Sequence, residues 1–127
     1  MHTDPIADLL TRIRNASRAH HQTVTVPYST IKENILKVMK SKGVIEDFKI
    51  EKGESFKIIE VVLKEDRSDV TLKRVSKPGQ RIYVKSDELK SIKSGLGFRI
   101  LSTPKGIMCN YDAKKQKLGG EVICEIF

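Results

Sequence analysis

The sequence predicts an α+β protein built from two small packed domains, because the pattern of its apolar residues changes once, near the middle of the chain. Before residue 66, two stretches have helical periodicity and three resemble strands. After residue 67, short strand-like segments are separated by Gly, Pro and charged turns. A length of 127 residues allows one ordinary domain or two small modules packed together. We expect domains over residues 1–66 and 67–127.

The first predicted element is an amphipathic helix. Ile6, Leu9 and Ile13 recur at helical spacing, while Asp4 suits the N-cap and Pro5 the first helical position. On the opposite face or at its edge the helix leaves three cations available to solvent or phosphate: Arg12, Arg14 and Arg18.

The N-terminal domain should continue as strand, helix, strand and strand. Residues 23–27 are predicted to form a strand, and a hydroxyl cap within residues 28–30 should start the second helix. That helix should end at Gly43. Two strands over residues 44–50 and 55–63 then form a hairpin. The buried stripe of the second helix is expected to be Ile31, Ile35, Val38 and Met39.

The C-terminal domain should be mostly antiparallel β with short helical turns. The polar run of residues 64–69 is the expected boundary, and Asn110 suits the cap of the second helical turn. Strands are predicted near residues 70–75, 81–85, 98–102, 106–109 and 121–127, and helical turns near 87–89 and 111–115.

Positive charge is concentrated in the second domain. The chain carries a formal charge of +8 and 31% charged residues. Residues 1–66 hold 11 basic and 10 acidic side chains, whereas residues 67–127 hold 13 and 6. Lys and Arg gain affinity for phosphates by displacing condensed counterions, so a polyanionic partner is expected.

Catalysis, metal binding and membrane insertion find no support in the sequence. Cys109 and Cys124 form neither a CxxC pair nor a zinc-like cluster, and two reduced thiols are expected. The chain shows no nucleophile elbow, HExxH or P-loop, and we expect no enzyme activity and no cofactor. No stretch reaches the roughly 20 apolar residues of a membrane span, and no signal peptide is evident, so a cytoplasmic protein without a membrane partner is predicted.

The densest basic segment covers residues 73–85, with five cations, no acid and one interleaved aromatic, Tyr83. It could be the solvated outer face of a β ribbon. We favour phosphate contact, because uncompensated charge would otherwise repel itself in the folded state. The predicted phosphate-binding residues are Arg74, Lys77, Arg81 and Lys85.

Two glycine-containing segments follow. Gly95 and Gly97 lack the third Gly of a dinucleotide fingerprint and precede a strand, so a steric role in a sharp turn or close approach is expected.

Residues 102–106 form a polar turn between apolar strands. Their hydroxyls could satisfy local backbone, or they could recognise RNA, which is read through 2′-hydroxyls, shape and unpaired bases. The residues for which that recognition is predicted are Ser102, Thr103, Lys105 and Gly106.

Several segments, spanning nearly the whole chain, resemble a known family. They are residues 4–16, 26–29, 74–79, 95–97, 100–108, 113 and 119–121. In these the chain is similar to bacterial small-subunit ribosomal protein eight. The resemblance implies a two-domain α+β protein that binds the central domain of small-subunit ribosomal RNA early in assembly and contacts neighbouring ribosomal proteins. It also implies that the Ser-Thr-x-x-Gly turn approaches an irregular RNA helix.

The resemblance implies that a messenger RNA could be a further partner, bound in autoregulation. We expect the free protein to be a monomer. Two positions depart from the family pattern: Cys109 stands where Thr or Ser is usual, and Gln116 where an apolar residue is frequent. Two other functions stay open. A DNA-binding regulator would need a recognition helix in the major groove, and a small enzyme would need a pocket of convergent titratable groups.

Overall fold

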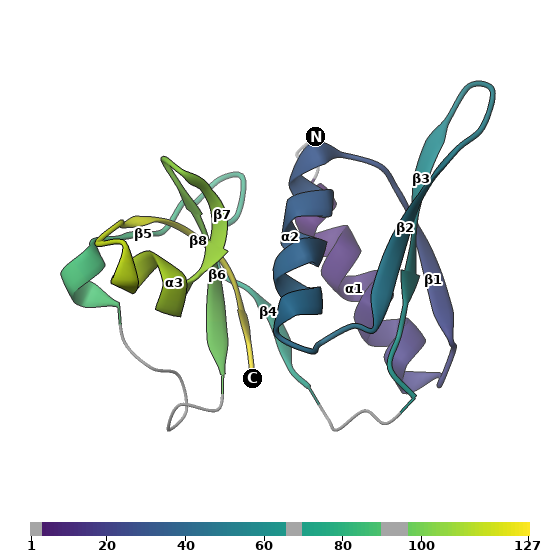
Figure 1. Ribbon diagram of the computed structural model, residues 1–127, viewed down its shortest axis with the longest axis horizontal. Helices are drawn as coiled ribbons and strands as arrows, with labels where there is room; N and C mark the ends of the chain where they lie inside the picture. The colour runs from purple at the N-terminus through teal and green to yellow at the C-terminus, as the bar shows by residue number, and fades with distance from the viewer. Residues whose placement is uncertain (1–3, 66–69, 90–96) are drawn as a thin grey trace. The chain divides into compact units, whose positions relative to one another are not determined.

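The chain divides into two compact units, each of which is described by itself. A computed structural model describes residues 4–65, 70–89 and 97–127 (Figure 1). One unit comprises residues 6–69, and the other residues 1–5 together with 70–127. The boundary predicted between residues 66 and 67 and the predicted turn at Gly95 lie outside the described residues. Helices and antiparallel sheets are both present, which confirms the α+β class.

The first unit is a three-stranded antiparallel sheet with two helices on one side of it (Figure 1). The sheet order is β1-β3-β2, so the last strand of the unit lies in the centre. The predicted apolar face of the first helix is confirmed, because Ile6, Leu9, Leu10 and Ile13 are all buried. The elements are α1 (Pro5–Arg18), β1 (Thr23–Pro27), α2 (Thr30–Ser41), β2 (Asp47–Lys52) and β3 (Lys57–Val62).

Helix α2 begins and ends as predicted. The Ser29 hydroxyl caps it by accepting a hydrogen bond from the amide of Lys32 at 3.3 Å. Gly43 follows the helix with a φ of +77°, a left-handed conformation that favours glycine. The chain can therefore turn directly from α2 toward β2.

The predicted buried stripe of α2 is wrong at Ile31. That side chain is 38% exposed and Val38 is only half-buried, whereas Lys32 is buried. The Lys32 ammonium donates a hydrogen bond to the Pro27 carbonyl oxygen at 3.1 Å. This contact lets a long cationic side chain lie inside the unit, because its polar end has a partner.

The second unit is a five-stranded antiparallel sheet. The order β4-β8-β6-β7 forms its main path, and β5 also pairs with β8 (Figure 1). Leu89, Leu101, Ala113 and Val122 form a buried cluster in this unit. The elements are β4 (Leu72–Arg74), β5 (Tyr83–Val84), the 3-10 helix η1 (Ser86–Glu88), β6 (Phe98–Thr103), β7 (Gly106–Cys109), α3 (Asn110–Lys115) and β8 (Gly120–Ile126).

The predicted cap of α3 is wrong by one residue. Cys109 occupies the N-cap position, and Asn110 is the first helical residue. The Asn110 Oδ1 atom instead accepts a hydrogen bond from the amide of Arg99 at 2.8 Å, which ties the helix to β6. The Cys109 thiol lies 3.4 Å from a carboxylate oxygen of Asp112.

Candidate nucleic-acid interface

The basic loop, residues 76–82, is held at both ends by one buried serine. The Ser76 hydroxyl accepts a hydrogen bond from the Ile82 amide at 2.8 Å and donates one to the Ile82 carbonyl oxygen at 3.2 Å. Inside the loop, Lys77 and Gln80 exchange two backbone hydrogen bonds of 2.9 Å across a tight turn. The Val122 amide also donates to Ile82, at 2.8 Å. The loop is therefore anchored on β8. Its two cations, Lys77 and Arg81, are exposed.

The β6–β7 turn, residues 103–106, is closed by the threonine hydroxyl. Thr103 Oγ1 donates to the Gly106 carbonyl oxygen at 2.8 Å and accepts from the Lys105 amide at 3.2 Å. Gly106 has a φ of +119°, which favours glycine. Among the described residues nothing pairs with the half-buried Ser102 hydroxyl. Thr103 thus holds the turn, and Ser102 keeps a hydroxyl available for a partner.

Strand β8 brings the two predicted segments together. Its Gly120 pairs with Val84 of β5, and its Glu121 pairs with Tyr83 of β5 on one side and Ser102 of β6 on the other. Directly paired residues in antiparallel strands point to the same face. The basic loop and the β6–β7 turn also project toward the same end of the unit (Figure 1). They form one candidate surface.

Two of the four cations predicted in the basic segment have partners inside the unit. The Arg74 Nε atom lies 3.1 Å from the Asp4 carboxylate, and Nη1 donates to the Ile123 carbonyl oxygen at 2.6 Å. Arg81 lies 3.0 Å from Glu121, the β8 residue that pairs with both Tyr83 and Ser102. The side chain of Arg74 is 9% exposed and that of Arg81 46%. Arg81 can therefore reach a ligand more readily than Arg74.

The remaining predicted cations of this unit are exposed lysines. Lys77, Lys85 and Lys105 are exposed, and no side chain in the described part of the chain pairs with their ammonium groups. A further exposed set of lysines, which was not predicted as a site from the sequence, begins in α3: Lys114, Lys115 and Lys117. Their near-consecutive spacing was the available signal, although a lysine run is more often a solvated helix end.

Tyr83 adds an aromatic surface between these cations. Its side chain is 68% exposed, although it lies on a strand in the middle of the candidate surface. An exposed aromatic ring beside lysines is the arrangement on which unpaired bases stack. No role could be predicted for this ring from the sequence, because its exposure follows from the register of β5.

The three predicted arginines of α1 belong to the first unit. Arg12 lies 3.0 Å from the Asp8 carboxylate and donates to the Thr25 carbonyl oxygen at 3.0 Å. Arg14 is half-buried, whereas Arg18 is exposed at the end of the helix. Arg12 therefore joins α1 to the edge strand β1 as well as carrying charge at the surface.

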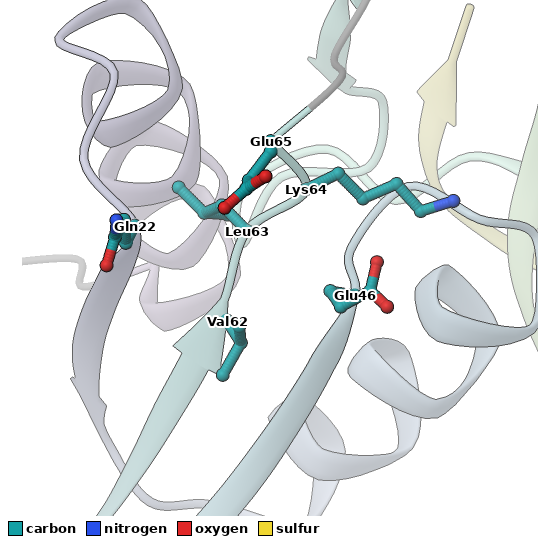
Figure 2. Close-up of a pocket in the computed structure, with 6 residues that line it drawn as sticks. All are labelled: Gln22, Glu46, Val62, Leu63, Lys64 and Glu65. Atoms are coloured by element: carbon teal, nitrogen blue, oxygen red, sulfur yellow. The ribbon is translucent and has the colours of Figure 1, made fainter.

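A groove of about 560 Å³ in the first unit has a different chemistry. Gln22, Glu46, Val62, Leu63, Lys64 and Glu65 line it (Figure 2). Its two carboxylates outnumber its single ammonium group. Because phosphates would be repelled there, the groove is a poor site for a nucleic acid.

The two cysteines are free and buried. Both pair with Ile100, from opposite sides of β6, so two strand spacings separate them, about 9.5 Å. That separation is too large for a disulfide. Burial raises the pKa of the Cys124 thiol to about 12, which leaves it protonated at neutral pH.

The described residues offer neither a metal site nor a membrane-spanning helix. No group of three or more His, Cys, Asp or Glu side chains there is arranged to hold a metal ion. None of the helices in the described ranges is both long and apolar enough to cross a membrane.

Known proteins resemble this chain over almost its whole length. Residues 4–127 match the family model of ribosomal protein S8. Small ribosomal subunit protein uS8 of Roseiflexus castenholzii is 48% identical, covering 98% of this chain and 97% of the relative. The protein of the same name from Sorangium cellulosum is 47% identical, and that from Kosmotoga olearia 48%, each covering all of both chains.

Proposed function

This chain belongs to the ribosomal protein S8 family, and we propose that it binds the central domain of small-subunit ribosomal RNA directly and supports assembly of the subunit. Its family makes it a structural protein of the small ribosomal subunit rather than an enzyme. One observation supports direct RNA binding most strongly: β8 joins the free hydroxyl of Ser102 to the exposed lysines of the neighbouring segments.

In this proposal affinity and recognition come from different residues. Lys77, Lys85 and Lys105 neutralise phosphates, with Arg81 at their edge, and the energy they supply is independent of sequence. The Ser102 hydroxyl donates to a ribose or base, and Gly106, which has no side chain, lets RNA approach the turn. Arg74 and Thr103 contribute by holding these groups in place.

Further partners belong to the same proposal. Arg14 and Arg18 of α1, together with Arg12, contact a second RNA segment. Neighbouring small-subunit proteins contact the chain on the ribosome in the cytoplasm, and the free protein is a monomer. The same RNA surface would bind a messenger RNA that imitates the ribosomal site, giving autoregulation.

The decisive experiment compares two adjacent hydroxyls in RNA footprinting and titration. Ser102→Ala should weaken ribosomal RNA binding by about 1–3 kcal/mol, or roughly five- to 150-fold, because an RNA group is left unpaired. Its melting temperature and its salt dependence should match the wild type. Thr103→Val should lower both stability and affinity, since its hydroxyl closes the turn.

Two outcomes would contradict the proposal. If the wild-type protein protects no compact site on the ribosomal RNA, direct binding is excluded. If duplex DNA competes better than the structured RNA, the chain is a DNA-binding protein. A folded Ser102→Ala variant with wild-type affinity would move recognition to another residue.

A further inference from the structure

Gly120, the first residue of β8, and Gly119, which precedes it, lie where no side chain fits. A Cβ atom at Gly120 would collide with the carbonyl oxygen of Ser102 and lie 2.9 Å from its carbonyl carbon. A Cβ atom at Gly119 would lie 2.5 Å from the Val84 carbonyl oxygen and 2.9 Å from the Cα atom of Lys85. The two glycines therefore face opposite neighbours, one on β6 and one beside β5.

Space, rather than backbone conformation, requires glycine at both positions. Neither has the positive φ that is found at Gly43 and Gly106. The obstructing atoms belong to the backbone, so a rotamer change cannot relieve the collision. Because β5 and β6 are both hydrogen-bonded to β8, a methyl group would displace a strand or the segment that follows it.

The displaced segments are the two halves of the candidate surface. Gly120 touches Ser102, which supplies the free hydroxyl and lies immediately before the β6–β7 turn. Gly119 touches Lys85, one of the exposed cations. The distance between the Lys85 cation and the Ser102 hydroxyl is thus set by the two glycines, which themselves offer RNA neither a charge nor a hydroxyl.

We propose that Gly119 and Gly120 are positioning residues that fix Lys85 and Ser102 at the spacing of a single RNA site. The inference rests on the proposed function, and it adds that affinity depends on the spacing of the two segments as well as on their contacts. Gly120 acts on the hydroxyl side and Gly119 on the cation side, so their substitution has distinguishable consequences.

The test measures ribosomal RNA affinity and its salt dependence for Gly119→Ala and Gly120→Ala. Gly120→Ala should lose at least about fivefold in affinity with an unchanged salt slope, because it displaces a hydroxyl contact. Gly119→Ala should lower the slope of log K against log salt by about 0.7–0.9, since it displaces one phosphate contact. Gly53→Ala is the control, because the nearest neighbours of its methyl group are ring atoms of exposed Phe56, which can move, and binding should stay unchanged.

A double variant separates positioning from a general loss of structure. If Gly120 acts through Ser102, the Ser102→Ala/Gly120→Ala protein should bind no more weakly than the weaker single variant, because both changes remove the same contact. Fully additive losses would overturn the inference. So would failure of both glycine variants to fold, because the glycines would then serve folding alone.

Failure of the inference can be told apart from failure of the proposed function. Weakened binding by Ser102→Ala with wild-type binding by a folded Gly120→Ala would overturn only the positioning role. Absence of ribosomal RNA binding by the wild-type protein would overturn both.

Discussion

The two units use their cations differently. In the first, one arginine and two lysines form ion pairs: Arg12 with Asp8, Lys37 with Glu33, and Lys40 with Asp47. Other cations of this unit, among them Arg18, Lys49 and Lys52, are exposed. In the second, the three described ion pairs all involve arginine, and the exposed lysines are left over: Lys73, Lys77, Lys85, Lys105, Lys114, Lys115 and Lys117.

The difference indicates which cations of the second unit are available to a phosphate. A guanidinium group is planar and weakly hydrated, so it suits half-buried pairs such as Arg74 with Asp4 and Arg99 with Glu125. An ammonium group is strongly hydrated and more readily stays in solvent, where it can meet phosphate. In the second unit we therefore expect arginines to maintain the fold and lysines to supply most of the affinity.

The largest effect expected from this division is on stability. Arg74→Met should lower the free energy of unfolding by about 3 kcal/mol, because it deprives the largely buried Asp4 carboxylate of its guanidinium. Lys73→Met, one residue earlier and exposed, should change it by less than about 0.5 kcal/mol. Urea unfolding measures both. Equal stability of the two variants would show that arginine has no structural role there.

Local sequence signals were enough to predict most of the elements. Hydroxyl and glycine signals marked the ends of α2, because capping depends on neighbours within a few residues. The turn at residues 103–106 was equally visible, since Pro, Lys and Gly between apolar strands favour a tight turn.

Features that depend on tertiary contacts were not predictable in this way. Periodicity placed Ile31 in the core, but the hydrogen bond from Lys32 to Pro27 favours the lysine instead. Asn110 has the chemistry of a cap, yet its amide side chain serves Arg99 on another strand. The roles of Gly119 and Gly120 depend on the register of three strands, which no segment of sequence contains by itself.

A smaller effect should distinguish the lysines of the two units in RNA binding. Lys77→Ala, Lys85→Ala and Lys105→Ala should each lower the salt slope by about 0.7–0.9 and leave the melting temperature unchanged. Lys37→Ala, in the first unit, removes an ammonium that lies 3.7 Å from Glu33 and should leave the slope unaltered. Filter binding over a range of salt concentrations is the measurement. A lower slope for Lys37→Ala alone would place the RNA surface on the first unit.

The smallest effect concerns Lys32, the buried lysine of the first unit. Burial lowers its pKa below the ordinary value of 10.5, an effect that Asp8 opposes and Arg12 reinforces. Between the folded and unfolded pKa values the unfolded chain binds more protons, so stability rises with pH in that window. The unfolding free energy of the wild type should therefore increase, relative to Lys32→Met, as the pH rises toward 10.5.

Lys37→Met, which removes an exposed ammonium, is the control for other groups that titrate in this range. Denaturant titrations at pH 8 and pH 10.5 measure the difference. Parallel pH profiles for the wild type and Lys32→Met would contradict this expectation. They would mean that the hydrogen bond from Lys32 to Pro27 fully offsets the free-energy cost of burying the charge. The first unit would then hold this ammonium group as readily as the second unit holds its exposed ones.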